Sequence, residues 1–334
     1  MADRNRFWRL DRPPKGEDFA AALSLQEEPL PRAGDGEVVY RADYLSMDAG
    51  TRMWMTRRED GYQPPLPLGA KMSGLAIGRV VESRADGFSE GDLVRGFGQW
   101  ADYSLVRPEL SALAKLDEDV DPRQHFGVLG LNAWTALVGV RDVAAAKRGE
   151  TVAVSAAAGA TGLLACQIAR ILGCRVVGVA GGAPKCGFLV KEGVVDQAID
   201  YKAENVEAAL SKLGGVDVYF DNVGGPILDA ALPNMALHGR VAVCGLIAGY
   251  AGEGPAPGPR RFDQVLMKRL AITGFFLPDH FERGPAFVET LRRWFDDGRI
   301  RMWFDETPGL ENALAAYGKL FSGGNVGKVL VSLR

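Results

Sequence analysis

Residues 151–180 read TVAVSAAAGATGLLACQIARILGCRVVGVA, and this stretch decides the fold. Its two ends, TVAVSA and RVVGVA, are short, apolar and rich in valine, which is typical of buried β-strands. The segment between them, ATGLLACQIARIL, has the length and composition of a helix. A strand, a helix and a second strand in this order predict a right-handed crossover and a parallel sheet.

The turn between the first strand and the helix contains two glycines, Gly159 and Gly162. Gly159 would let the backbone approach a phosphate, and Gly162 would let the helix pack close to the strand. Free N–H groups at the start of the helix would then hold a pyrophosphate. Ala156 stands where the G-x-G-x-x-G pattern has its first glycine, so the motif taken alone also fits a tight turn without a ligand. Its position between a strand and a helix favours a dinucleotide site.

The end of the second strand indicates which dinucleotide binds. NAD sites usually have an Asp or Glu there, which holds the ribose hydroxyls. This chain instead reads VGVAGGAPKC, without an acid and with Lys185 shortly after the strand. An ammonium group attracts a ribose phosphate, and the Tyr201 hydroxyl could lie across the same phosphate. We therefore expect NADPH, although Lys185 taken alone also fits a solvated lysine in the first turn of a helix.

Strands and helices continue to alternate after this stretch. Strand patterns occur at residues 216–224, 239–247 and 270–277, and helical patterns at residues 184–193, 227–236 and 285–297. The first third of the chain, to about Val120, consists of short strand-like segments between glycines and charges. A final strand-like segment, VGKVLVSL, is expected to return to this first domain. The stretch Ala248–Arg261 is rich in Gly and Pro, which predicts a mobile loop.

Composition and charge argue against several other classes of protein. The chain has 334 residues, of which 47% are apolar, and its formal net charge is −3. This balance gives no reason to expect nucleic acid as a partner. No segment approaches the roughly 18 uninterrupted apolar residues of a membrane-spanning helix. The four cysteines lack C-x-x-C spacing and the N-terminus has no apolar signal segment, which together favour a reduced, cytoplasmic protein.

Seven segments, taken in order, resemble the zinc-free branch of the medium-chain dehydrogenase/reductase superfamily. Within this branch the chain looks like the alkenal/one double-bond reductases, which include prostaglandin, plant double-bond and curcumin reductases. The segments are YLSMD (44–48), LGAKMSGLAIGRVVES (68–83), GDLVRGFGQWADY (91–103), SAAAGATG (155–162), DVYFDNVGG (217–225), LHGRVAVCG (237–245) and FSGGNVGKVLV (321–331). The resemblance covers nearly the whole chain.

The resemblance implies an α/β protein with two domains. Residues 124–295 would form a Rossmann domain, with a doubly wound parallel sheet that binds NADPH. Residues 1–123 and 296–334 would form a β-rich, GroES-like catalytic domain. The family also implies a homodimer.

The same resemblance implies a set of residues around the cofactor. The glycine turn would hold the pyrophosphate, and Lys185 and Tyr201 would hold the ribose phosphate. The full set is Gly159, Ala160, Thr161, Gly162, Lys185, Tyr201, Asn222, Cys244, Gly245, Leu246, Ile247, Tyr250, Phe275, Phe276, Leu277 and Asn325. Without the resemblance, Asn222 and Asn325 would be interpreted as loop asparagines that cap their own turns.

Two segments depart from the family pattern where substrate or nicotinamide should bind. Family members usually follow YLSxD with Pro-Tyr-Met-Arg, whereas residues 49–52 here are Ala-Gly-Thr-Arg. The missing tyrosine would leave space in the substrate pocket. The usual Met-Pro-Gly-Leu-Thr-Ala-Tyr is Leu-Asn-Ala-Trp-Thr-Ala-Leu at residues 131–137. The identity of the substrate therefore stays open.

The residues needed for a catalytic zinc are missing from the sequence. Zinc dehydrogenases of this superfamily use a Cys, a His and an acid around a metal with an open position. This chain has only three histidines, His125, His238 and His280, and no nearby pair of cysteines. We therefore expect no metal, and without this Lewis acid the oxidation of an alcohol is disfavoured.

Reduction of an activated C=C bond fits what remains. NADPH would deliver hydride to the β-carbon of an α,β-unsaturated ketone or aldehyde, in the cleft between the two domains and under the Ala248–Arg261 loop. Tyr250 is the candidate catalytic acid for the enolate, although its ring fits an aromatic wall equally well, with water or the ribose hydroxyl as proton source. The alternatives are an NADPH quinone reductase and a non-catalytic NADPH-binding sensor. Turnover with an enone and comparison with quinones would separate the three.

Overall fold

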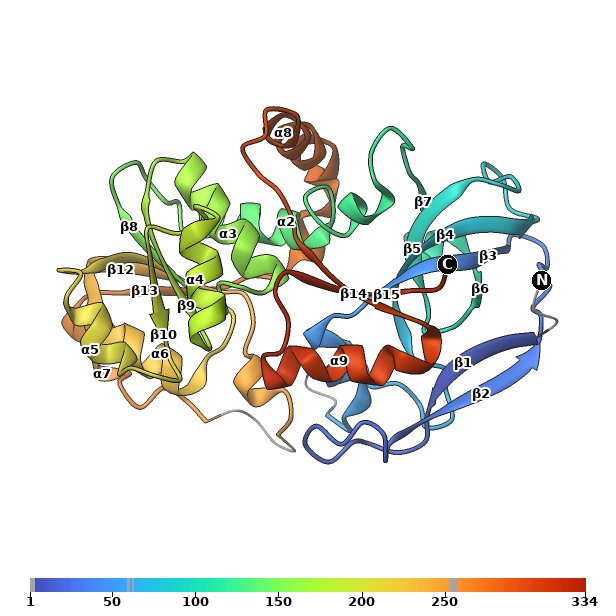
Figure 1. Cartoon of the computed structure of the whole chain (residues 1–334), viewed down its shortest axis with the longest axis horizontal. Coiled ribbons are helices and arrows are strands. Elements are labelled where there is room, and N and C mark those ends of the chain that lie inside the picture. Colours follow the sequence, from blue (N-terminus) through green and yellow to red (C-terminus); the bar gives the residue numbers. More distant parts are fainter. Residues whose placement is uncertain (1–3, 59–60, 62, 253–256) are drawn as a thin grey trace. The chain divides into compact units, whose positions relative to one another are not determined.

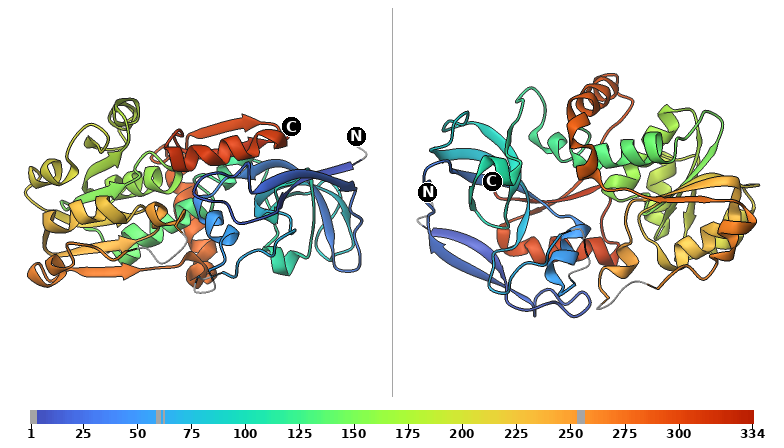
Figure 2. Two further views of the ribbon diagram at one scale, coloured as in Figure 1. Left: turned by 90° about the horizontal axis from the view of Figure 1, so that it is seen from below. Right: turned by 180° about the vertical axis from the view of Figure 1, so that it is seen from behind.

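The structure is a computed structural model that describes residues 4–58, 61, 63–252 and 257–334, and its chain divides into two compact units. The first unit contains Met1–His125 and Phe304–Arg334, and the second contains Phe126–Trp303. Figure 1 and Figure 2 trace the elements of each unit. In the part of the chain that is described, every helix is too short or too polar to cross a lipid bilayer.

A six-stranded parallel sheet forms the centre of the second unit, in the order β10-β9-β8-β11-β12-β13. Its strands are β8 (Thr151–Ser155), β9 (Arg175–Ala180), β10 (Gln197–Asp200), β11 (Val216–Asp221), β12 (Met235–Val243) and β13 (Ala271–Gly274). In chain order within the unit this is 3-2-1-4-5-6, the doubly wound order of dinucleotide-binding folds. The predicted α/β fold class, a Rossmann sheet plus a β-rich domain, is therefore confirmed.

Helices connect these strands and pack against them. They are α2 (Leu131–Leu137), the π-helix η3 (Val138–Val143), α3 (Ala160–Ile171), α4 (Ala183–Lys191), α5 (Val206–Ser211), α6 (Gly225–Ala231), η4 (Leu232–Asn234), η5 (Ile247–Gly249), α7 (Asp263–Met267), η6 (Leu277–Arg283) and α8 (Gly284–Asp296). Among them, α3 packs against β8 and β9, and α4 against β9 and β10. Helix α2 packs against α3.

Small and β-branched side chains build the core of this sheet because both of its faces are covered. Neighbouring strands align Val177, Ala153, Tyr219 and Val241 in one row across the sheet. All four are at most 1% exposed. Buried parallel strands are expected to be apolar along their whole length rather than in alternation, and TVAVS and RVVGVA have this composition.

Four predicted elements of the second unit need correction. Strand β11 ends at Asp221 instead of residue 224, and β13 spans Ala271–Gly274 instead of residues 270–277. Residues 235 and 236, predicted as the end of a helix, begin strand β12, because Pro233 follows the helix α6 and the chain turns there through η4. Strand β12 also ends at Val243 instead of residue 247, since the N–H groups of Cys244 and Gly245 bond to the carbonyl of Asp221. The predicted Ala248–Arg261 loop falls partly on residues 253–256, which lie outside the described residues.

The first unit is rich in β-structure. Its strands are β1 (Arg4–Leu10), β2 (Leu23–Pro29), β3 (Val38–Ser46), β4 (Ser73–Ser83), β5 (Leu93–Gln99), β6 (Tyr103–Val106), β7 (Ala114–Lys115), β14 (Phe304–Pro308) and β15 (Lys328–Ser332). Its helical elements are η1 (Ala49–Met55), α1 (Pro108–Ser111), η2 (Pro122–His125), η7 (Leu310–Asn312) and α9 (Ala313–Ser322). The larger sheet has the order β14-β15-β3-β4-β5-β7, with β6 also paired to β3.

The predicted return of the chain to this unit is confirmed. Strand β15 pairs antiparallel with β3, aligning Val331 with Leu45, and it pairs parallel with β14. Figure 1 shows these late strands, in red, beside β3, in blue. Helix α9 closes the core of the unit, where the ring of Tyr317 lies 5.1 Å from that of Trp100 and 4.8 Å from that of Phe19.

A buried carboxylate, Asp221, joins the ends of the central strands of the second unit. The sheet order reverses between β8 and β11, so the carboxyl ends of these two strands flank a crevice. The Ser155 hydroxyl, at the end of β8, donates to Asp221 Oδ1 at 3.0 Å. The N–H groups of Val223 and Gly224 donate to the same oxygen at 3.0 Å each. Burial raises the pKa of Asp221, and these donors act against that rise by stabilising the ionised form.

Replacement of Asp221 by Ala should lower the free energy of unfolding by about 2–4 kcal/mol, because it leaves the donors from Ser155, Val223 and Gly224 without an acceptor. Asp221→Asn keeps one oxygen for the same donors and should cost clearly less. Denaturant unfolding of both variants measures the difference. Asp297→Asn, at an exposed position, is the matched control. Equal losses in the Ala and Asn variants would show that the charge of Asp221, and not its acceptors, stabilises this junction.

Candidate cofactor site

The turn between β8 and α3 presents open backbone donors. Gly159 is the residue before α3, and no side chain caps the helix. The first N–H groups of an α-helix have no partner within the helix, so those of Ala160, Thr161 and Gly162 can face an anion. A Cβ on Gly162 would lie 2.2 Å from the carbonyl oxygen of Ala156, so only glycine lets the helix lie this close to the strand.

Ala156 takes over the conformation of the glycine that the motif lacks. Its φ is +47°, in the left-handed region that residues with a side chain rarely adopt. The N–H of Gly159 then bonds back to the Ala156 carbonyl at 2.9 Å, which closes the turn before the helix begins. The chain thus makes a glycine-like turn with an alanine at this position.

A second corner forms where β9 and β10 end, and it gathers the two residues predicted to hold a ribose phosphate. Lys185 lies in the first turn of α4, directly after β9. The Tyr201 ring lies over Gly181, where a Cβ would come within 2.8 Å of the ring and its hydroxyl. The backbone N–H of Tyr201 bonds to the carbonyl of Ala180 at 3.1 Å. Lysine and phenol therefore belong to the same corner of the sheet.

The sequence analysis missed an acid in this corner. Asp200 ends β10, and its Oδ1 accepts a hydrogen bond from the N–H of Gly182 at 2.7 Å and another from Lys202 at 3.0 Å. These two backbone donors lower the pKa of Asp200. The carboxylate fixes the turn between β9 and α4. Its signal in the sequence was its position directly before Tyr201.

The residues predicted around the ends of β11 and β12 also lie together. Asn222 donates from Nδ2 to the Ser155 carbonyl at 2.7 Å, and its backbone N–H donates to the Ser155 hydroxyl at 2.8 Å. The N–H of Ile247 bonds to the Asn222 carbonyl at 3.3 Å. Cys244 and Gly245 are fixed by the Asp221 carbonyl, as described above. Burial raises the pKa of Cys244 to about 12, so its thiol stays protonated.

Tyr250 points back toward this junction. Its hydroxyl accepts a hydrogen bond from the N–H of Leu246 at 3.1 Å. Burial raises the pKa of the Tyr250 phenol above its usual value. The hydroxyl therefore keeps its proton at neutral pH, and the raised pKa makes it a weaker acid than an exposed tyrosine.

The three residues after β13 are partly or fully buried. The ring of Phe275 lies 6.3 Å from that of Phe220. A Cβ on Gly139, in η3, would lie 2.4 Å from Phe220 and 2.7 Å from Phe275, so this glycine lets the two rings pack against the helix. Leu277 is buried, and Phe276 is half-buried.

Asn325 belongs to the first unit, unlike the other predicted residues. It is buried, and its Nδ2 donates to the carbonyl of Gly327 at 3.0 Å. This bond stabilises its own turn, which was the structural alternative for Asn325. Its carbonyl oxygen stays available as an acceptor in that geometry.

The histidines occupy structural positions. His125 is buried, its Nε2 lies 3.2 Å from the carbonyl of Asp117, and burial lowers its pKa. His238 has a φ of +61° within β12, where the pairing of this strand with β11 shifts register, and its N–H bonds to the Lys268 carbonyl. Within the described ranges, no group of three or more His, Cys, Asp or Glu residues could hold a metal ion.

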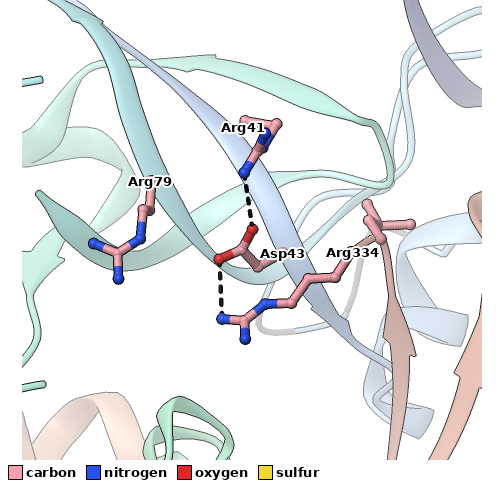
Figure 3. Close-up of a pocket in the computed structure, with 5 residues that line it drawn as sticks. Arg41, Asp43, Arg79 and Arg334 are labelled. Atoms are coloured by element: carbon pink, nitrogen blue, oxygen red, sulfur yellow. Dashed lines mark hydrogen bonds and ion pairs between the residues drawn. The ribbon is translucent and has the colours of Figure 1, made fainter. Parts of the chain in front are cut away.

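The first unit has a charged pocket of about 420 Å³, which Figure 3 shows. It is lined by Arg41, Asp43, Arg79, Leu333 and Arg334. Asp43 lies between two of the arginines, 3.1 Å from Arg334 and 3.7 Å from Arg41. Arg79 pairs with Glu118 at 2.7 Å. None of the residues predicted around the cofactor lines this pocket, and its charges are largely paired.

Comparison with known proteins identifies the family of the chain. A model described as the N-terminal domain of oxidoreductases matches residues 6–114, and one described as zinc-binding dehydrogenase matches residues 160–293. The NADPH-dependent curcumin reductase of Escherichia coli (strain K12) is 37% identical, over 98% of this chain and 96% of its own length. The NADP(+)-dependent 2-alkenal reductase of Nicotiana tabacum is 38% identical, over 89% of this chain and 88% of its own.

Among solved structures, that of CurA from Vibrio vulnificus in complex with NADPH matches with a TM-score of 0.92 and 33% identity. The match covers 98% of this chain and 99% of that one. Relatives of this identity span nearly the whole chain, so the chain belongs to the alkenal/one double-bond reductase family, in the zinc-free branch of the medium-chain dehydrogenases/reductases.

Proposed function

We propose that this protein reduces the C=C bond of α,β-unsaturated ketones or aldehydes with NADPH and without a metal ion. The names of its relatives, a curcumin reductase and a 2-alkenal reductase, support this reaction. The observation that carries it is the uncapped start of α3 at the point where the sheet order reverses. This is where doubly wound folds bind dinucleotides.

In this proposal the second unit binds the cofactor and the first is the GroES-like catalytic domain. The N–H groups of residues 160–162 hold the pyrophosphate, and the corner of Lys185 and Tyr201 holds the ribose phosphate. The segments after β11, β12 and β13, with Asn325, line the remainder of the cofactor. Asp200 lies in the same corner, and the dipoles of the two backbone N–H groups bonded to its Oδ1 partly offset its negative charge.

When bound, NADPH supplies the hydride that adds to the β-carbon of the substrate. The electron pair of the C=C bond then moves to the carbonyl oxygen as an enolate, and the α-carbon takes up a proton to complete the reduction. The chain must orient the alkene and stabilise the enolate oxygen. The protonated hydroxyl of Tyr250 is our candidate for this hydrogen bond or for the proton itself, with water or the cofactor ribose as the alternative source.

The function is tested by following NADPH consumption with a panel of enals, enones and quinones. Simple enones should turn over, faster than quinones, and extensive chelation of metals should leave the rate unchanged. Consumption of NADPH with quinones only would contradict the proposal. NADPH binding without turnover of any compound would favour a sensor.

Lys185→Ala tests the cofactor site within the same assay. The loss of one charge-assisted contact to the ribose phosphate should raise the KM for NADPH about tenfold or more, with little change for NADH. Lys191→Ala, at the exposed far end of α4, is the matched control. The unmodified enzyme should prefer NADPH, and equal use of both cofactors would refute this assignment.

Tyr250→Phe tests the proton donor. If Tyr250 is the general acid, removal of its hydroxyl takes away an interaction made in the transition state and should lower kcat and kcat/KM together, by about 100-fold. The affinity for NADPH, measured without substrate, should stay nearly constant. Hydride transfer at the unmodified rate in single turnovers of the Phe variant would remove Tyr250 from the mechanism. A change in substrate KM alone would assign it a wall contact.

We also propose that two copies of the chain form a homodimer through the β13 edge. β13 is the last strand of its sheet and its outer edge has no partner strand among the described residues. Shortly before β13 in the chain, α7 and the preceding Phe262 expose apolar side chains, with Phe262 62%, Leu266 72% and Met267 58% exposed. An exposed edge beside an apolar patch suits pairing with an identical edge across a twofold axis.

The double variant Leu266→Asp/Met267→Asp should shift the protein from dimer to monomer, because it places charges in the proposed interface. Light scattering on a size-exclusion column measures the mass. Leu110→Asp, which alters a leucine of the first unit that is 79% exposed, should leave the dimer intact. A monomeric unmodified protein would rule out the dimer.

The cysteines support a cytoplasmic location, which we propose on this basis. All four, Cys166, Cys174, Cys186 and Cys244, are free thiols. Unpaired cysteines are the usual state in a reducing compartment. Recovery of the protein from an extracellular or periplasmic fraction would contradict this location.

A further inference from the structure

A side-chain hydrogen bond links the first turn of α2 to the first turn of α3. Asn132 donates from Nδ2 to the hydroxyl oxygen of Thr161 at 2.9 Å, across 29 residues of sequence. Thr161 is the second residue of α3, within the turn that we assign to the pyrophosphate. Asn132 is not part of the set of cofactor residues implied by the family. It stands where the family pattern has proline, which offers no side-chain donor.

The hydrogen bond leaves the Thr161 proton unused. Other helical threonines of this chain donate to the carbonyl four residues earlier, as Thr135 does to Leu131 at 2.8 Å and Thr290 to Ala286 at 2.9 Å. Thr161 lies too early in its helix for such a carbonyl, and among the described residues its hydroxyl donates to no acceptor. A hydroxyl that accepts one bond from an amide still has its own proton to give.

Helix α2 is anchored, so Asn132 is a fixed donor. Ala133 and Ala136, on the same helix, are fully buried. The Trp134 ring lies 5.8 Å from that of Phe287, and a Cβ on Gly284 would come within 2.9 Å of it. These contacts with α8 hold the helix, and with it the amide that reaches Thr161.

We propose that Asn132 is a positioning residue of the cofactor site, which orients the Thr161 hydroxyl so that its proton points to the pyrophosphate of NADPH. This proposal rests on the proposed function. The amide occupies one lone pair of the hydroxyl oxygen, so the O–H bond turns away from Asn132 and stays free for an anion held at the start of α3. A hydroxyl joins the backbone donors there, and its bond to a phosphate is charge-assisted.

The test is a double-mutant cycle on NADPH affinity, measured without substrate by quenching of protein fluorescence. Thr161→Val removes the hydroxyl and should weaken NADPH binding about tenfold. Asn132→Ala removes its orientation and should weaken binding about three- to tenfold. The double variant should bind no more weakly than Thr161→Val, because Asn132 acts only through that hydroxyl. The Asn132→Asp variant should bind NADPH more weakly than the Asn132→Ala variant, since a carboxylate accepts the hydrogen bond of the Thr161 hydroxyl and repels the phosphate.

Adenosine 2′-monophosphate separates this role from a structural one. It carries the ribose phosphate and lacks the pyrophosphate, so its affinity should be the same in all variants. Thr161→Ser should restore most of the affinity for NADPH that Thr161→Val loses. Asn234→Ala removes an asparagine amide that donates to the carbonyls of Glu207 in α5 and Ala230 in α6, remote in sequence from the turn, and should leave both affinities unchanged.

Three results would overturn the proposal. They are unmodified NADPH affinity in Asn132→Ala, additive losses in the double variant, and an equal loss of affinity for adenosine 2′-monophosphate. These results differ from failure of the proposed function, in which the unmodified protein itself would not bind NADPH.

Discussion

The Ser155 hydroxyl at the end of β8 and the N–H groups of Val223 and Gly224, just after β11, converge on the carboxylate of Asp221, and the strand ends of the second unit depend on this convergence. The side chain joins the ends of β8 and β11, while its backbone carbonyl accepts the N–H groups that end β12. Backbone hydrogen bonds join the strands of a parallel sheet along their length, but the segments that follow their carboxyl ends are free to diverge. A buried acceptor with several lone pairs holds them in one place.

Six residues of the predicted set are arranged around that junction: Asn222, Cys244, Gly245, Leu246, Ile247 and Tyr250. Asn222 follows Asp221 directly and bonds to Ser155. The segment with Tyr250 is held by the bond from the Ile247 N–H to the Asn222 carbonyl and by the bond from the Leu246 N–H to the Tyr250 hydroxyl. The site is therefore built on strand ends rather than on an independent loop. Such a base fixes the positions of reacting groups more closely than a surface loop does.

Local patterns allowed most of the fold to be predicted from the sequence. The strand–turn–helix at residues 151–172 and the returning strand β15 both have patterns that can be recognised within a dozen residues. The end of β12 could not be predicted in this way, because a carbonyl on another strand determines it. The predicted helix end at residue 236 was wrong for a different reason. Pro233 is a local signal for the end of a helix, and the prediction followed the apolar pattern across it.

The residues of the candidate site likewise differ in whether a local pattern identifies them. Lys185 and Tyr201 were recognisable from residue type and position after a strand. The bonds that join Asp200 to Gly182, Asp221 to Ser155 and Asn132 to Thr161 span 18, 66 and 29 residues, and side-chain bonds between elements leave no periodic signal in the sequence. The partner strand β15 also has a consequence for synthesis of the protein. Residues 126–303 leave the ribosome as a complete unit while the half of β3 around Leu45 still lacks β15 along one edge. A nascent chain therefore carries an unfinished sheet until its last strands emerge. During this interval the exposed strand edge needs protection from aggregation.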